Sequence, residues 1–124
     1  MTVSRTVRAA AIIGIVCATA VLSAHTKLVN SEPKAGAALT TAPKQVELWF
    51  NEKIDPAVSK IELTSAVGKV ALGPVHAVDD KSLMAPITGK VDAGTYSITW
   101  QTAGDDGHVV KGEVAFSVKS ASTR

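Results

Sequence analysis

Hydrophobic and polar residues alternate with period two along most of the chain, and this pattern predicts strands rather than helices. The alternation is clearest in residues 46–50, 95–101 and 113–118, where apolar side chains occupy every second position. A strand with one buried face requires this spacing, because successive side chains point to opposite faces of a sheet. Shorter strands are predicted at residues 27–31, 61–63, 70–72 and 82–85.

About seven short strands separated by glycine, proline and aspartate turns predict an all-β fold. We expect an antiparallel Greek-key β-sandwich or barrel, because no segment after residue 26 has convincing helical periodicity. Tyr96 follows a tight turn and is expected to form a tyrosine corner, in which its hydroxyl forms a hydrogen bond with backbone a few residues earlier in the chain. Trp100 is expected in the core, whereas Trp49 has the opposite parity to its apolar neighbours and is expected over an open sheet face.

The first 24 residues follow a different pattern. Arg5 and Arg8 precede an apolar run from residue 9 to about 22, which is too short and too poorly flanked for a spanning helix. This arrangement is typical of a secretory signal peptide, with an uncleaved anchor as the alternative. Two cut positions fit: Ala20 ends an A-x-A motif, while cleavage after Ala24 would make a histidine the first residue. The sequence thus predicts a signal peptide followed by one domain, with the cut after Ala20 or after Ala24.

Removal of the signal changes the charge of the chain. Arg5 and Arg8 leave with it and no acidic residue does, so 13 basic residues become 11, against 11 acidic ones. A neutral domain without a basic run gives no support to nucleic-acid binding. The single cysteine, Cys17, lies inside the signal. Metal chemistry in the remaining domain would therefore use mainly nitrogen and oxygen donors.

The connection between residues 101 and 112 is longer than a tight hairpin needs, and it contains Asp106 and His108. If this segment is extended, residues two apart point to the same side, so that a carboxylate and an imidazole face one point. Cleavage after Ala24 would add the α-amine and imidazole of His25 to these donors. Three nitrogens and one oxygen suit tetragonal Cu(II), and zinc could use the same donors tetrahedrally. The alternative is a solvated polar loop. His76 is interpreted as a surface histidine.

Four blocks of the sequence resemble the CopC family of periplasmic copper-binding proteins. They are H-x-K-L-V-x-S-x-P-x-x-G at 25–36, V-E-L-W-F-N-E at 46–52, A-G-T-Y-S-I-T-W at 93–100 and D-G-H-V-V-K-G-E-V-A-F-S-V at 106–118. The resemblance implies a cupredoxin-like or immunoglobulin-like sandwich, cleavage after Ala24, and Cu(II) bound by His25, Asp106 and His108. The glutamate of the family's F-x-E motif corresponds to Glu52, which we expect beside the copper ligands.

The resemblance also implies a function. We expect a periplasmic, non-catalytic protein that carries or buffers Cu(II) in copper homeostasis and resistance, with a CopD-like inner-membrane copper transport protein as its partner. Some members of the family have a methionine-rich Cu(I) site, but residues 64–75 contain no methionine and Met84 alone cannot make one. A Cu(I) site is therefore not expected.

Two other functions are compatible with parts of this pattern. A histidine-brace oxidative copper enzyme, resembling a lytic polysaccharide monooxygenase, would also begin with a histidine on a β-sandwich. Against it, the chain is short, lacks aromatic substrate platforms, and places a carboxylate where oxygen would bind the metal. The other alternative is a metal-free interaction module in which the histidines have no ligand role.

Overall fold

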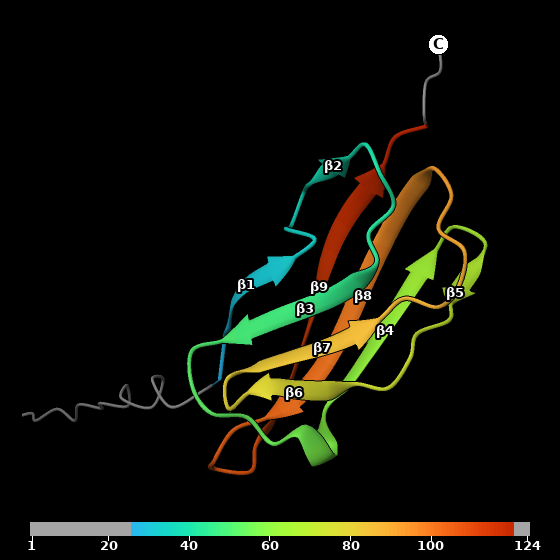
Figure 1. The fold of residues 1–124 in the computed structure, drawn as a ribbon. Helices are drawn as coiled ribbons and strands as arrows, with labels where there is room; N and C mark the ends of the chain where they lie inside the picture. Colours follow the sequence, from blue (N-terminus) through green and yellow to red (C-terminus); the bar gives the residue numbers. More distant parts are fainter. Residues whose placement is uncertain (1–25, 121–124) are drawn as a thin grey trace, which may run out of the picture.

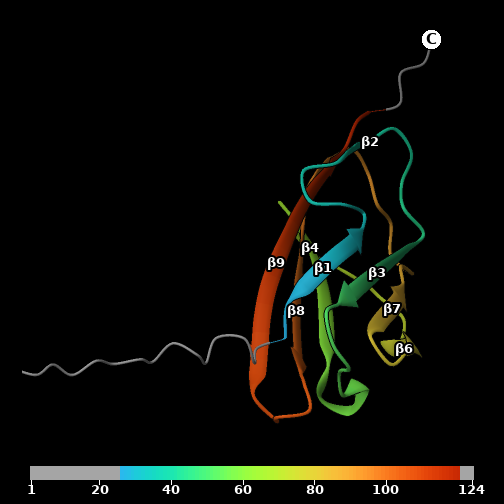
Figure 2. The ribbon, with the colours of Figure 1, turned by 90° about the vertical axis from the view of Figure 1, so that its left-hand side faces the viewer.

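The structure, a computed structural model, describes residues 26–120, which form a sandwich of two β-sheets (Figures 1 and 2). The four-stranded sheet has the order β1-β3-β7-β6, and the five-stranded sheet has the order β2-β9-β8-β4-β5. The connections after β1, β2, β3, β5 and β7 each cross from one sheet to the other. The strands are β1 (Leu28–Glu32), β2 (Ala38–Leu39), β3 (Gln45–Phe50), β4 (Lys60–Ser65), β5 (Gly68–Val70), β6 (His76–Asp79), β7 (Ser82–Pro86), β8 (Gly94–Ala103) and β9 (Val109–Val118).

The predicted all-β antiparallel sandwich is confirmed, and the seven predicted strands are all present, most with shifts of one or two residues at their ends, while β9 begins four residues before its predicted start. Two strands were not predicted, namely β2 and β6. β2 has only two residues and pairs in parallel with β9, whereas all four residues of β6 are exposed. Neither strand has a buried face, and therefore neither shows the alternation on which the prediction depends. Residues 26–120 contain no helix with the length and hydrophobicity that crossing a bilayer requires.

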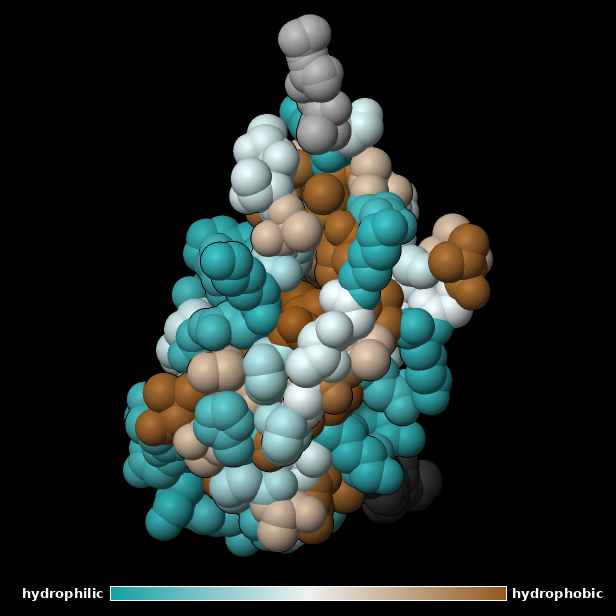
Figure 3. All heavy atoms as spheres, turned by 45° about the vertical axis from the view of Figure 1, so that its right-hand side comes forward, coloured by the Kyte–Doolittle hydropathy of each residue, from teal (hydrophilic) through white to brown (hydrophobic). Residues whose placement is uncertain are grey.

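The core lies between the two sheets and is built from the alternating apolar positions of both. Trp100 is 8% exposed and meets Phe50 edge to face at 5.1 Å between ring centroids, which confirms its predicted core position. Trp49 is half-buried on the opposite parity. Buried apolar side chains include Val46, Leu48, Phe50, Ile61, Leu63, Leu83, Ile98, Trp100, Val114 and Phe116. On the side shown in Figure 3, hydrophobic residues reach the surface in narrow strips between hydrophilic side chains.

The predicted tyrosine corner is present. The Tyr96 hydroxyl donates a hydrogen bond of 2.6 Å to the carbonyl of Asp92, and its ring stacks on Phe116 at 5.4 Å. This bond ties the start of β8 to the loop that precedes it. Tyr96 thus has the structural role that the sequence predicted.

Backbone hydrogen bonds join several connecting segments at one end of the sandwich. The Asn51 N–H donates to the Lys27 carbonyl, the Ile54 N–H to Asp80, and the Asp55 N–H to Ala103. The beginning of β1, the segment after β3, the β6–β7 turn and the end of β8 therefore meet there (Figure 1). In the β6–β7 turn, hydrogen bonds from the Lys81 N–H and the Ser82 hydroxyl lower the pKa of the Asp79 carboxyl.

Candidate metal centre

Asp106 and His108 lie in the loop between β8 and β9, at the end of the sandwich where β1 begins. The Gly107 N–H donates to the Gly104 carbonyl at 3.0 Å and closes a turn, and Gly107 has the left-handed φ of 77° that glycine adopts readily. An extended segment was the condition under which the sequence placed Asp106 and His108 on one side, and the structure has a turn here instead. The loop must reverse direction to enter β9, which a fully extended chain could not do.

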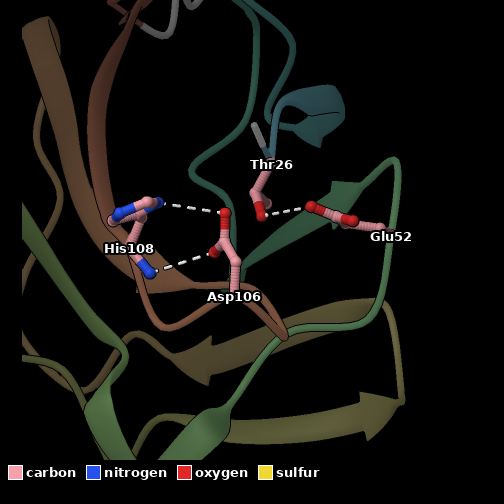
Figure 4. A network of polar contacts seen from close by, with 4 residues as sticks. All are labelled: Thr26, Glu52, Asp106 and His108. Carbon is pink, nitrogen blue, oxygen red and sulfur yellow. Dashed lines mark hydrogen bonds and ion pairs between the residues drawn. The ribbon is translucent and has the colours of Figure 1, made fainter. Parts of the chain in front are cut away.

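The turn nevertheless brings Asp106 and His108 together. Asp106 accepts a 3.0 Å hydrogen bond from the His108 backbone N–H through Oδ1, and its Oδ2 lies 3.1 Å from Nδ1 of the His108 ring (Figure 4). A protonated Nδ1 donates to this carboxylate, which assigns the lone pair to Nε2. The His108 side chain is 72% exposed and that of Asp106 is 35% exposed. The loop therefore presents one carboxylate and one imidazole at the same point of the surface.

Thr26 fixes the beginning of the described chain beside this loop. Although polar, Thr26 is only 5% exposed, and its hydroxyl donates a 2.8 Å hydrogen bond to Oε2 of Glu52. Lys27 and Asn51 then exchange two further bonds: the Lys27 N–H reaches the Asn51 side chain at 2.8 Å, and the Asn51 N–H reaches the Lys27 carbonyl at 2.9 Å. The chain is thus held to the segment after β3 before β1 begins.

Gly104 allows the Thr26–Glu52 pair to pack against the β8–β9 loop. A Cβ atom at position 104 would fall 2.3 Å from the Thr26 hydroxyl oxygen and 3.0 Å from Oε2 of Glu52. No side chain fits there, so the Thr26–Glu52 pair packs directly onto the backbone where the loop starts. In Figure 4, Asp106 is drawn between His108 and this pair. Glu52 was expected beside the ligands, and the contact that the structure gives it is with Thr26.

The third predicted ligand, His25, lies outside the described residues, as does the predicted signal segment. Among residues 26–120, no group of three or more His, Cys, Asp or Glu side chains is placed to hold a metal ion. Within that range, Asp106 and His108 are the two predicted ligands that the structure brings together. His76 lies on the exposed strand β6, with Nδ1 3.3 Å from the Pro74 carbonyl.

Three residues that shape the centre were missed by the sequence analysis, namely Thr26, Asn51 and Gly104. Each is a common residue in a loop or at a strand end, and its role depends on partners far away in sequence. The only local signal was at Gly104, since a glycine directly after a buried strand often marks a close approach of backbone.

Comparison with known proteins finds a matching family model and relatives of similar sequence. Residues 28–119 match the family model of the CopC domain. The chain is 38% identical over 104 residues to copper resistance protein C of Xanthomonas campestris pv. juglandis, covering 77% of this chain and 81% of that protein.

Solved structures agree with this match. The fold is similar to PcoC, a methionine-rich copper resistance protein from Escherichia coli, with a TM-score of 0.70 and 31% identity over 77% of this chain and 100% of that chain. It is also similar to CopC from Methylosinus trichosporium OB3b, with a TM-score of 0.70 and 26% identity over 81% of this chain and 99% of that one.

Proposed function

The chain belongs to the CopC family, and from this premise we propose that it is a copper-binding protein of copper resistance and homeostasis whose centre is formed by His25, Asp106 and His108. In this role it carries or buffers Cu(II) and performs no catalysis. The family match supports copper as the ion. The position of Thr26 and the chemistry of the donors support the ligand set and the oxidation state.

The burial of Thr26 against Gly104 carries this proposal. Consecutive Cα atoms are about 3.8 Å apart, so residue 25 must lie within one peptide of a residue whose position is fixed. Thr26 packs where the loop begins, and Asp106 follows two residues after Gly104. The amine and the imidazole of a terminal His25 would therefore be delivered to the side of the loop that holds the other donors.

The chemistry of these donors suits Cu(II). An α-amine and two imidazoles supply nitrogen, and a carboxylate supplies oxygen, the combination that favours tetragonal Cu(II). Asp106 also orients the His108 ring through Nδ1, as carboxylates beside ligating histidines commonly do. The exposure of the His108 side chain lets an incoming ligand approach, which a protein that loads and releases its ion requires.

The same proposal covers location and partner. We place the protein in the periplasm, exported by the signal at residues 1–24 and cleaved after Ala24, because only this cut creates the terminal amine. A CopD-like inner-membrane copper transport protein would then receive the ion. We expect no Cu(I) site of the methionine-rich kind, since residues 64–75 lack methionine.

One comparison tests the centre. Cu(II) affinity is measured by competition titration in residues 25–124 and in a variant with one alanine added before His25, with an alanine added after Arg124 as the matched control. Extension at the front removes the terminal chelate and is expected to weaken binding about 100-fold, the upper range for lost ligand support. Equal affinity of the two forms would exclude His25 as anchor.

A second assay separates the carrier from an enzyme. Hydrogen peroxide formation is measured with the copper-loaded protein and a reductant, and little turnover above free copper is expected. Sustained turnover would instead support the histidine-brace oxidative enzyme. Absence of any binding in residues 25–124 would favour a metal-free interaction module.

A further inference from the structure

Met84 lies on the outer face of the four-stranded sheet. It sits in β7 between Leu83 and Ala85, which are both fully buried in the core. Because successive side chains of a strand point to opposite faces, the Met84 side chain points away from the core. It is of intermediate exposure, so its thioether sulfur can be reached from the solvent side of the sheet.

Strand pairing places His76 beside this methionine. β6 lies next to β7 at the edge of the sheet (Figure 1), and the antiparallel register sets His76 directly opposite Met84. Residues in such positions share a face of the sheet, with Cβ atoms about 4.5–5.5 Å apart. His76 is exposed, so the imidazole and the thioether can bring their donor atoms to one point above the sheet.

A hydrogen bond determines which nitrogen of His76 can bind a ligand. Its Nδ1 lies 3.3 Å from the Pro74 carbonyl, and because a carbonyl can only accept, Nδ1 carries the proton. The lone pair of the neutral ring is therefore on Nε2. Histidines that bind metal ions commonly donate their other N–H in this way, to a backbone carbonyl or a carboxylate.

The Pro74 carbonyl is itself held in position by β7. The N–H of Gly73, the residue before Pro74, donates a 2.7 Å hydrogen bond to the carbonyl of Pro86 at the end of that strand. A Cβ atom at position 73 would fall 2.7 Å from Cγ of Pro86, so the two segments are in close contact. The strand that carries Met84 thus also anchors the segment that orients the His76 ring.

Negative charge lies on the other side of Met84. Glu47 of β3 is directly opposite Met84, and Glu32 of β1 is directly opposite Glu47. Lys34, which lies 4.0 Å from Glu32, offsets part of this charge. The carboxylate of Glu47 beside the thioether therefore favours a cation over an anion at this position.

We propose that His76 and Met84 form a second site, which binds Cu(I) through Nε2 and the thioether sulfur. Thioether sulfur selects Cu(I) among the copper ions, and imidazole suits copper as well. Monovalent coinage-metal ions accept low coordination numbers, so a pair of donors is sufficient. A site with one thioether differs from a methionine-rich one. The sequence analysis considered Met84 alone, and strand pairing supplies the second donor.

This site is separate from the candidate metal centre. It lies on the outer face of β6 and β7 and uses neither the β8–β9 loop nor the beginning of the chain. Its donors also differ, because a thioether replaces the carboxylate and the amine. The two sites can therefore fail independently in the experiments below.

A single NMR signal tests the site, because Met84 is the only methionine in residues 25–124. This chain, labelled with carbon-13 at the methionine methyl group, is titrated with Cu(I) without oxygen, and with Ag(I) as a redox-stable substitute in chloride-free buffer. The methyl signal and the His76 ring signals are expected to shift together with either ion. Mg(II), which prefers oxygen donors, should leave the methyl signal unchanged.

Two variants separate the pair from either donor alone. His76→Ala is expected to weaken the Ag(I) affinity read at the methyl signal at least about tenfold, the lower range for lost support of a metal ligand. His108→Ala is the matched control, since it removes a ring of the other centre and should leave this affinity unchanged. Met84→Leu nearly conserves side-chain volume and should weaken the response of the His76 ring to a similar extent.

Cu(II) affinity of the terminal centre should be the same in His76→Ala and Met84→Leu as in the original chain. A methyl signal that does not respond to Cu(I) would overturn the proposal. An equal response of that signal without His76 would also overturn it, because the thioether would then bind the ion without the imidazole.

Discussion

Gly104 determines whether Thr26 can pack against the start of the β8–β9 loop. Its hydrogen occupies a space bounded by the Thr26 hydroxyl and the Glu52 carboxylate, with no room for a methyl group. The Thr26–Glu52 pair is partly shielded from solvent, because Thr26 is buried and Glu52 is of intermediate exposure. A hydrogen bond between a hydroxyl and a carboxylate is stronger than one between neutral groups, so it orders the chain at Thr26.

The substitution Gly104→Ala is expected to weaken Cu(II) binding about tenfold, equivalent to about 1.4 kcal/mol. The added methyl group would displace Thr26 from Glu52 and shift the residue before it away from Asp106 and His108. Competition titration measures the change. Thr26→Ser keeps the hydroxyl and serves as the control, with affinity expected near the original. Unchanged affinity in G104A would show that the Thr26–Glu52 pair does not position the terminal ligands.

At the level of single residues, the sequence identified the donors Asp106 and His108 but not the residues that position them. The spacing of Asp106 and His108 was sufficient to predict their proximity, because residues two apart meet in a turn as well as in an extended segment. Thr26, Asn51 and Gly104 could not be found in the same way. Their contacts join residues more than twenty positions apart, and only the fold determines such pairings.

The pairing of β8 with β9 depends on a second close approach. Gly112 lies opposite Trp100, and a Cβ atom at position 112 would fall 2.3 Å from the indole ring. The ring therefore fills the space that a side chain on β9 would take. Its Nε1 is buried and makes no hydrogen bond within the described residues. Trp100 thus holds its position by packing, against Phe50 on one side and the β9 backbone on another.

Gly112→Ala is expected to lower the free energy of unfolding by about 1–3 kcal/mol, the usual cost of overpacking a core. Urea denaturation followed by circular dichroism measures this loss, and tryptophan fluorescence should report the displaced ring. Thr99→Ala changes an exposed side chain on the neighbouring strand and should stay within about 0.5 kcal/mol. Equal stability of G112A would mean that Trp100 can rotate without cost.

Elements with one buried face were predictable, and those without one were not. β3 and β8 alternate buried residues with more exposed ones along most of their length, and β9 does so from Val114 onward. β6 is exposed at every residue, and β2 exists only because it lies beside β9. Edge strands of this kind take their structure from a neighbour, and single-sequence periodicity carries no record of that neighbour.

At the scale of the whole molecule, the sandwich joins two distant parts of the sequence at one end. Thr26 lies two residues before β1, and the β8–β9 loop returns to the same end just before the last strand, β9 (Figure 1). A centre built from both parts exists only in the folded protein. Copper bound there is therefore linked to folding.

Cu(II) is expected to raise the melting temperature of residues 25–124, because an ion that binds the folded state stabilises it by mass action. The unfolded chain would keep the terminal chelate, so the increase reports mainly the share of Asp106 and His108. The increase should diminish on acidification, because protons compete with the metal for the amine and imidazole donors. Calorimetry at several pH values measures it.

His108→Ala is the matched variant for this experiment. It keeps the terminal amine and the first imidazole but loses the ring from the β8–β9 loop, so copper should stabilise it far less. An equal increase in melting temperature for both proteins would place the ion on the terminal chelate alone and remove the loop from the centre.

The burial of Thr26 also sets an order for maturation. A signal peptidase needs extended, accessible backbone on both sides of the bond it cuts, and the bond after Ala24 lies only two residues before a side chain that is 5% exposed. Once Thr26 has docked, the enzyme can no longer straighten the chain across that bond. If the signal is cut after Ala24 as proposed, processing would therefore have to precede completion of the sandwich, and the metal would be bound last.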